Sequence, residues 1–291
     1  AVAADVKSSL KEASGAVSQV KIFELTTTGL NEFNNNYRPS SGISGNIETV
    51  EALDWSPDGK FLIAAGYGPT TQARIYGFDH KHTLSELASV AIDFGNSSTV
   101  YDVAWHPSGN HIALGGGVGE SGSRIRIHTF ENDQNSLDGY LTWTCTNGIY
   151  DACQTRYGLS WSADGTKLAA VGGAGLGGAE VLAFDFYPTT SLLSHLPLCD
   201  FTHGGTVASA MWSNDSKHLS LTGYTGSTGV HSRILKFETN KFSEVSSAQI
   251  KSDSGVPIRY GDVVTLKHSQ TSKFLSTSWK TWWQAGLNKD D

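Results

Sequence analysis

Two carboxylates in this sequence have the spacing and setting that could support chemistry. Asp54 and Asp102 lie in two similar apolar segments, Asp54 directly before Trp55 and Asp102 three residues before Trp105. Hydrolysis of a glycosidic bond needs a pair of such groups, one as an acid and one as a base or nucleophile. Two further copies of the segment hold Ser160 and Met211 where the first holds Asp54, so the acids do not form a ring. We therefore predict that Asp54 and Asp102 are hydrogen-bonding residues, and that no catalytic set is present.

Three other segments have the composition of ion or cofactor sites. Residues 79–82 offer one aspartate and two histidines, but zinc sites need three or four ligands and no second cluster is evident. Residues 132–135 with Asp138 are rich in oxygen but lack the acidic spacing and closing glutamate of a calcium loop. Residues 173–178 fit G-x-G-x-x-G, yet an alternating strand pattern follows where a dinucleotide site needs a helix. We predict a surface loop, a solvated turn and a hairpin loop, with no metal and no cofactor.

The three cysteines are informative about the cellular compartment of the protein. Cys145 and Cys153 flank a short loop containing Asn-Gly, where a disulfide is sterically reasonable; two free, half-buried thiols are the alternative. Cys199 has no evident partner in the sequence, and we predict a small core residue. A disulfide would favour an extracellular or cell-surface location, with the cytoplasm as the alternative.

Composition narrows the class of protein. The chain has 291 residues, and 8 tryptophans, 10 tyrosines and 12 phenylalanines are enough to build a core. Charged residues are only 17% and glycine occurs 32 times, which is typical of short strands joined by tight turns. The net charge of −7, without a lysine or arginine cluster, argues against nucleic acid as a partner. No run of 18 apolar residues occurs, so we expect no membrane span.

The strongest pattern is a phrase repeated four times, made of a tryptophan, a tight polar turn and an apolar run. The copies cover residues 50–66, 100–116, 156–172 and 207–223. Their tryptophans are Trp55, Trp105, Trp161 and Trp212, separated by 50, 56 and 51 residues. A period in this range indicates a repeat architecture. Because each tryptophan holds the same position in its repeat, we predict packing between neighbouring units rather than sugar stacking.

Each repeat divides into four strands by its alternation and turn residues. In the second copy the expected strands are residues 101–106, 111–115, 124–130 and 140–144. The fourth strands of the other copies are expected at residues 87–94, 196–201 and 242–250. The repeats would span about residues 48–98, 99–153, 154–204 and 205–255. Four antiparallel strands at this period form the blade of a β-propeller, so we predict an all-β propeller fold.

The hairpin sequences WSPDGKFLIAAG and WSADGTKLAAVG resemble the first-to-second strand hairpin of WD-repeat propellers. The resemblance covers about residues 18–250 and implies the propeller fold. Three details depart from that family: the third strands do not end in Trp-Asp, no Gly-His opens a blade, and the blades are longer. The histidine–aspartate network of WD repeats is therefore not expected, and only Asp102 resembles its aspartate.

The two ends of the chain are predicted to share a fifth blade. Residues 16–25 match a third strand, and residues 258–278 read as strand, turn and strand with Lys267 in the tryptophan position. Pairing of residues 1–47 with residues 256–291 would close a five-bladed ring without exposed sheet edges. Residues 258–278 also resemble the opening of a MIR-type β-trefoil module, and on that alternative residues 256–291 are a fragment of a separate domain.

Regular repeats without catalytic signatures predict a non-catalytic scaffold for protein interactions or structure, and not an enzyme. Trp279, Trp282 and Trp283 make the last segment unusually aromatic, so we expect it to pack on another surface and to let subunits associate through their termini. The expected partners are other proteins or a second copy of the chain. The alternative is a carbohydrate-binding or glycoside-cleaving propeller with a glycan as its ligand. An intracellular WD-like adaptor is a third hypothesis.

Overall fold

The described part of the structure consists of β-strands with one short 3-10 turn. The computed structural model describes residues 2–6, 19–26, 29–32, 49–68, 71–79, 84–94, 98–117, 123–144, 155–173, 179–190, 192–225 and 231–248. Within these ranges no helix has the length and apolar character needed to cross a bilayer.

The strands are grouped into four blades and one smaller sheet. Blade 1 contains β4 (Thr49–Trp55), β5 (Phe61–Tyr67), β6 (Ala73–Phe78) and β7 (Leu84–Ile92). Blade 2 contains β8 (Thr99–Trp105), β9 (His111–Gly117), β10 (Ser123–Glu131) and β11 (Ser136–Thr144). Blade 3 contains β12 (Thr155–Trp161), β13 (Lys167–Gly173), β14 (Val181–Tyr187) and β15 (Leu192–His195). Blade 4 contains β16 (Gly205–Trp212), β17 (His218–Thr225), β18 (Ser232–Glu238) and β19 (Lys241–Ala248). The smaller sheet contains β1 (Val2–Val6), β2 (Gln19–Thr26) and β3 (Gly29–Glu32).

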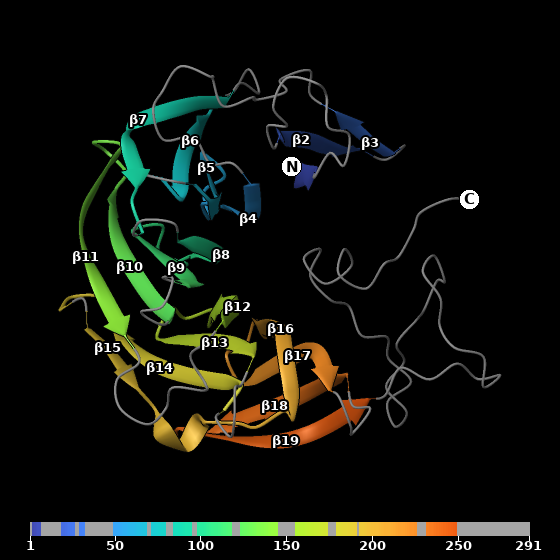
Figure 1. Ribbon diagram of the computed structural model, residues 1–291. Coiled ribbons are helices and arrows are strands. Elements are labelled where there is room, and N and C mark those ends of the chain that lie inside the picture. Colours follow the sequence, from blue (N-terminus) through green and yellow to red (C-terminus); the bar gives the residue numbers. More distant parts are fainter. Residues whose placement is uncertain are drawn as a thin grey trace.

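The blades follow one another around an arc, as Figure 1 shows, with β4, β8, β12 and β16 innermost and β7, β11, β15 and β19 outermost. All strands within a blade pair antiparallel to their neighbours in sequence. A backbone pair between Tyr67 and Thr99 joins blade 1 to blade 2, and a pair between Gly173 and Thr206 joins blade 3 to blade 4. The predicted all-β propeller fold is confirmed.

The apolar core lies between blades. One cluster joins blade 1 to blade 2 and contains Trp105, a second joins blade 2 to blade 3 and contains Trp161, and a third joins blade 3 to blade 4 and contains Trp212. Trp55 packs against a fourth cluster that includes Ile22 of β2, so the smaller sheet packs on blade 1. Each tryptophan thus packs on the preceding blade or sheet, and burying such a ring contributes on the order of a few kcal/mol.

Every innermost strand carries a β-bulge at the same position, next to the glycine that ends the repeated phrase. The register shifts after Val50, Val100, Arg156 and Val207. Glycine is required opposite the bulge because a Cβ on Gly116 or Gly223 would overlap the carbonyl oxygen of Thr99 or Thr206. The bulge therefore explains why this glycine recurs.

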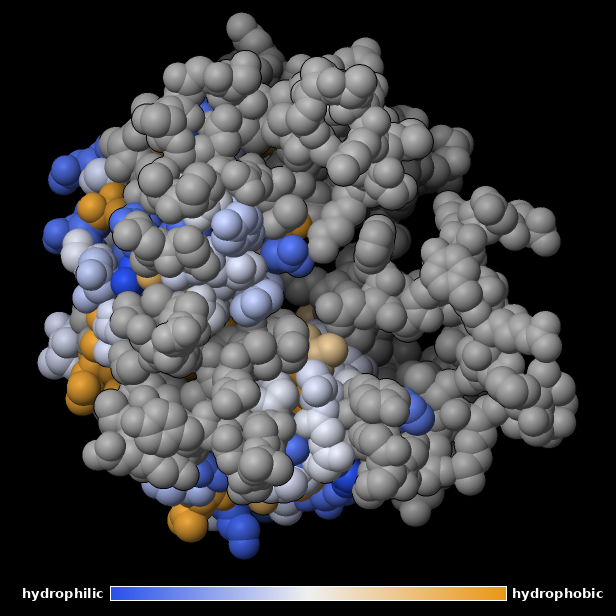
Figure 2. All heavy atoms as spheres, in the orientation of Figure 1, coloured by the Kyte–Doolittle hydropathy of each residue, from blue (hydrophilic) through white to orange (hydrophobic). Residues whose placement is uncertain are grey.

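Exposed hydrophobic side chains are scattered. On the face shown in Figure 2, hydrophobic patches along the outer edge of the described blades are small and are separated by hydrophilic ones. Most of the large apolar side chains of the four blades are instead buried in the clusters between them.

One strand expectation was wrong. The fourth strand of blade 3 is β15, not residues 196–201, where Pro197–Cys199 form a 3-10 turn. Pro197 has no N–H to donate to a β-ladder and favours the first turn of a helix. The N-terminal strand predicted at residues 16–25 corresponds to β2, which pairs with β1 and β3. The predicted closing segment and the MIR-like alternative both lie in residues 256–291, outside the described residues. The predicted fifth blade depends on that segment and stays a prediction.

Candidate functional site

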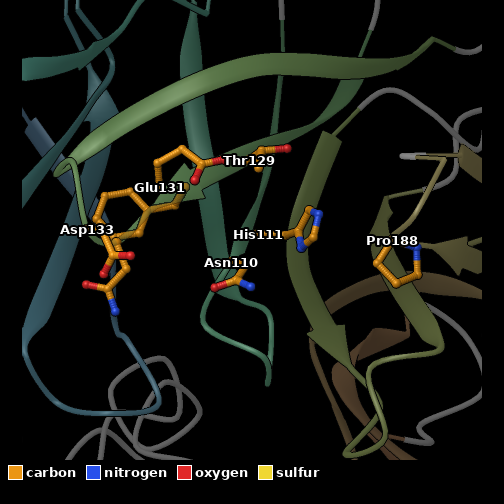
Figure 3. Close-up of a pocket in the computed structure, with 8 residues that line it drawn as sticks. Asn110, His111, Thr129, Glu131, Asp133 and Pro188 are labelled. Carbon is orange, nitrogen blue, oxygen red and sulfur yellow. The ribbon is translucent and has the colours of Figure 1, made fainter.

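A polar pocket of about 490 Å³ opens between blade 2 and blade 3. It lies where the turns between first and second strands and between third and fourth strands emerge (Figure 3). Its lining consists of Asn110, His111, Thr129, Phe130, Glu131, Asn132, Asp133 and Pro188. In the view of Figure 3, Glu131 and Asp133 lie on one side and His111 and Pro188 on the other, with Asn110 between them. Three chain segments distant in sequence thus meet here.

Local turns hold these side chains in place. In the turn that follows β8, the N–H of His106 donates to the carbonyl of His111 at 2.8 Å, which places Asn110 and His111 at the start of β9. The N–H of Phe130 donates to the carbonyl of Asn110 at 2.8 Å, so β10 is attached to the same turn. Asn135 closes the β10–β11 turn with a positive φ of 50°, a conformation that asparagine tolerates.

His111 is the titratable side chain most affected by this setting. Its side chain is only 8% exposed, and its ring lies 5.1 Å from the ring of Phe186 in β14. Burial, with a smaller contribution from the nearby His106, lowers the pKa of His111 to about 4. The imidazole is therefore neutral at pH 7. Within the described part of the chain, its buried Nδ1 has no hydrogen-bond partner.

His106, next to the pocket, links the two blades. Its Nδ1 accepts a hydrogen bond from the backbone N–H of Ser108 at 3.0 Å, so the proton is on Nε2. Nε2 in turn donates to the carbonyl of Gly165 in blade 3 at 2.9 Å. Burial lowers the pKa of His106, which keeps the ring in this neutral tautomer. His106 thus connects blade 2 to blade 3 beside the pocket.

A second hollow of about 250 Å³ adjoins the first, between blade 1 and blade 2. Asn132 lines both hollows, and Asp58 adds a carboxylate to the second. Hydrogen bonds from Ser56 and Lys60 lower the pKa of Asp58 against the opposing effect of burial, which is the largest single contribution. Polar side chains therefore continue across this end of three blades.

The carboxylates singled out in the sequence lie elsewhere. Asp54 Oδ2 accepts the N–H of Trp105 at 2.6 Å, and Asp102 Oδ2 accepts the N–H of Leu159 at 2.7 Å. Ser160 repeats this contact, because its Oγ accepts the N–H of Trp212 at 3.1 Å. These side chains hold each innermost strand to the next one and do not line the pocket.

Of the other candidate site residues predicted from the sequence, some lie within the described residues and others do not. Residues 132–135, predicted to be a solvated turn, are exposed, and two of them line the pocket. Cys199 is buried, and burial raises the pKa of its thiol to about 12, as expected of an inert core residue. The described residues contain no group of three or more metal-binding side chains. Outside the described residues lie Cys145, Cys153, most of residues 79–82 and 173–178, and the tail residues Trp279, Trp282 and Trp283.

Asn110, His111 and Glu131 were not predicted as site residues from the sequence. One signal could have found His111: the sixth residue after each tryptophan is Phe61, His111, Lys167 and His218 in the four copies, a variable position in a regular phrase. A polar residue replaces phenylalanine at this position in three of the four copies, so the position marks a place where the blades differ.

Known proteins resemble the chain in part of its sequence and in its fold. The family model "WD domain, G-beta repeat" (WD40) matches residues 38–70 and 88–127. A search of curated protein sequences finds no match. Crystal structures of proteins described as candidate 6-phosphogluconolactonases from Bacteroides uniformis and Bacteroides fragilis are similar, each with a TM-score of 0.57 and with 15% and 16% identity. A functionally unknown protein from Desulfotomaculum acetoxidans is similar with a TM-score of 0.53 and 13% identity.

These alignments cover 79–81% of this chain and 69%, 65% and 62% of the three other proteins, in the order given. The chain therefore spans about two thirds of their length.

The prediction of a non-catalytic scaffold, and with it the prediction that the chain is not an enzyme, is wrong. It treated regular repeats without a catalytic motif as evidence against catalysis, yet two of the similar structures are described as candidate lactonases. A propeller brings together groups from separate blades, so its sites need not appear as a contiguous motif. The chain folds as a β-propeller with WD-repeat-like blades.

Proposed function

We propose that the chain is a hydrolase that opens the cyclic ester of a sugar-derived lactone in the pocket between blades 2 and 3. The observation that carries the proposal is the fold likeness to two proteins described as candidate 6-phosphogluconolactonases, over 81% and 80% of this chain. The pocket volume of about 490 Å³ supports it, since small-molecule sites range over roughly 300–1,000 Å³.

The pocket side chains suit the proton transfers of this reaction. Water oxygen adds to the ring carbonyl carbon, the bond from that carbon to the ring oxygen breaks, and an open hydroxy acid results. A base must take a proton from the water, and the departing ring oxygen must receive one. Glu131 and Asp133 are exposed carboxylates at the pocket, and either can accept the proton of the attacking water.

His111 supports the carbonyl end of the reaction. A neutral imidazole has one N–H donor and one acceptor nitrogen. A donor held in place by burial stabilises the negative charge that develops on the carbonyl oxygen without first being reorganised. Asn110 and Thr129 add polar groups that can bind the ring hydroxyls.

Glycoside hydrolysis is the second candidate function. Two carboxylates at one sugar site are its minimum requirement, and Glu131 and Asp133 both line this pocket. The two reactions share the site but differ in the bond that breaks, so substrates distinguish them.

The test is hydrolysis by the purified chain of glucono-δ-lactone, galactono-γ-lactone and a panel of chromogenic glycosides, each corrected for spontaneous hydrolysis. Glu131→Gln and Asp133→Asn separate the two carboxylates, and His111→Asn tests the donor. We expect the variant that lacks the base to lose about 100-fold or more in kcat, in line with the usual contribution of general base catalysis.

Glu238→Gln is the matched control. Glu238 ends β18 as Glu131 ends β10, each directly after a phenylalanine, but it lies in blade 4 and does not line the pocket. Its variant should keep full activity. Loss of lactone hydrolysis in Glu238→Gln to the same degree as in Glu131→Gln and Asp133→Asn would show that the pocket is not the site. Cleavage of glycosides but not lactones would favour the second candidate.

A further inference from the structure

The pocket between blades 2 and 3 contains no side chain that is positively charged at neutral pH. Its eight lining residues, all described by the structure, include the carboxylates Glu131 and Asp133 but neither lysine nor arginine. His111 is neutral because burial lowers its pKa to about 4. His111 also points to a ligand independently of the acids, since it is 8% exposed, lines the pocket and has a buried Nδ1 without a partner among the described residues.

The cationic side chain that the structure describes on strand β10 is engaged elsewhere. Arg126 shares β10 with Glu131, but its guanidinium lies 4.8 Å from the ring centre of Phe94 and 4.7 Å from that of Tyr140. It also donates to the carbonyl of Asp93 at 2.6 Å. These contacts hold Arg126 in the sheet of blades 1 and 2.

The same holds for two described lysines of the adjoining blades. Lys167, at the start of β13, forms an ion pair with Asp185 at 2.8 Å. Lys60 forms one with Asp58, beside the second hollow, at 3.3 Å. Among the residues that line the two hollows, the charged side chains are Glu131, Asp133 and Asp58, and Asp58 is paired with Lys60. The whole chain has a net charge of −7.

A phosphate group would be poorly placed in such a pocket. It carries about −1.5 to −2 charges at pH 7 and is normally bound by arginine, lysine or backbone N–H groups. Like charges within a Debye length, about 8 Å at physiological salt, repel each other. An uncharged polyhydroxylated ring instead offers hydroxyl donors to Glu131 and Asp133 and both donors and acceptors to Asn110 and Thr129.

We infer that the pocket takes an uncharged, unphosphorylated sugar lactone and discriminates against a 6-phosphorylated one. This rests on the proposed lactone hydrolysis. It separates this chain from two of its structural neighbours, which are described as candidate 6-phosphogluconolactonases. Glu131 and Asp133 serve both as hydrogen-bond acceptors for the ring and as the groups that exclude the phosphate.

The experiment compares kcat/KM for glucono-δ-lactone and 6-phosphoglucono-δ-lactone at low and at physiological salt. We expect at least a tenfold preference for the uncharged lactone, which narrows as salt screens the repulsion. The double variant Glu131→Gln/Asp133→Asn removes both charges and lowers activity, so its specificity is read from binding. The probes are 1,5-anhydroglucitol and its 6-phosphate, two ring analogues that cannot be hydrolysed, measured by calorimetry.

In the native chain, 1,5-anhydroglucitol should bind more tightly than its 6-phosphate, and the double variant should reduce the difference. The Glu238→Gln control should leave it unchanged. Equal or better use of the phosphorylated lactone would overturn this inference while leaving lactone hydrolysis intact. If neither lactone is hydrolysed but the uncharged analogue still binds selectively, the proposed reaction fails and the specificity of the pocket stands. If neither analogue binds, the pocket is not a sugar site and the inference fails.

Discussion

Gly165 in blade 3 faces the imidazole of His106 in blade 2 so closely that a methyl group on Gly165 would overlap Nε2. The same contact surface carries the hydrogen bond from His106 Nε2 to the Gly165 carbonyl. One turn of blade 3 thus fits against one side chain of blade 2, beside the proposed active site.

Replacing Gly165 with alanine should weaken this contact. Gly59 holds the equivalent turn position in blade 1, also with φ of +71°, but has nothing within 4 Å of the place where a Cβ would lie. Both Gly165→Ala and Gly59→Ala incur the cost of a left-handed alanine, about 1–2 kcal/mol. Gly165→Ala adds an overlap in a packed region, so we expect it to lower the free energy of unfolding by about 1–3 kcal/mol more than Gly59→Ala does. Urea unfolding measures both, and equal losses would contradict the fit.

Among the side chains that connect the innermost strands, the charged ones should contribute more to the free energy of unfolding than the neutral one. Asp54→Ala leaves the N–H of Trp105 without its acceptor and should lower the free energy of unfolding by about 1–3 kcal/mol. Ser160→Ala should cost less, because a neutral hydroxyl accepts from Trp212 at 3.1 Å, a longer distance. Asp138→Asn, an exposed change in the β10–β11 hairpin, serves as the control and should stay within about 0.5 kcal/mol. A larger loss from Ser160→Ala than from Asp54→Ala would refute this order.

Arg126 should not be replaceable by lysine. Its planar guanidinium lies 4.8 Å from the ring centre of Phe94 and 4.7 Å from that of Tyr140, and Arg126 is only 7% exposed. An ammonium group keeps the charge but cannot stack on both rings. We expect Arg126→Lys to lower the free energy of unfolding by about 1–2 kcal/mol, against almost no change for the exposed Lys241→Arg. Unfolding curves that coincide with the native one would argue against the stacking contribution.

The propeller should lose stability on acidification at pH values higher than those at which its carboxylates become protonated. Burial is the main cause that lowers the pKa of His111, His128 and His203 to about 4 each, from 6.5. The unfolded chain therefore binds more protons than the folded one between pH 6.5 and 4, and stability falls as the pH is lowered through this window. Above pH 6.5 these histidines contribute no pH dependence.

Thermal unfolding at constant ionic strength from pH 7.5 to 4 measures this loss. Replacing His203, which is 1% exposed, with glutamine should flatten the decline by removing one of these protonation steps. A melting temperature that stays constant down to pH 4.5 in the native chain would show that these histidines remain accessible to protons in the fold.

Local patterning was enough to predict the strands and turns. Alternating residues set the strands, and a turn glycine set the hairpins, as in the segment from Trp105 to Gly116. The exception is residues 196–201, where the apolar pattern indicated a strand but Pro197 interrupts the ladder and forms a 3-10 turn. An apolar pattern carries no information on whether a backbone N–H is available for the β-ladder. The strand prediction was therefore wrong at Pro197, which lacks that N–H.

The sequence by itself determined the repeat, the blade hairpins and the tryptophans that pack between blades, because each depends on neighbours a few residues away or on a constant period. Only the tertiary structure decided where the pocket lies. Asn110, Glu131 and Pro188 are separated by 21 and 57 residues and meet because blade 3 packs against blade 2. It also decided that His111 is neutral, since the burial that lowers its pKa comes partly from Phe186 on the next blade. Desolvation is a property of packing, and no local pattern contains it.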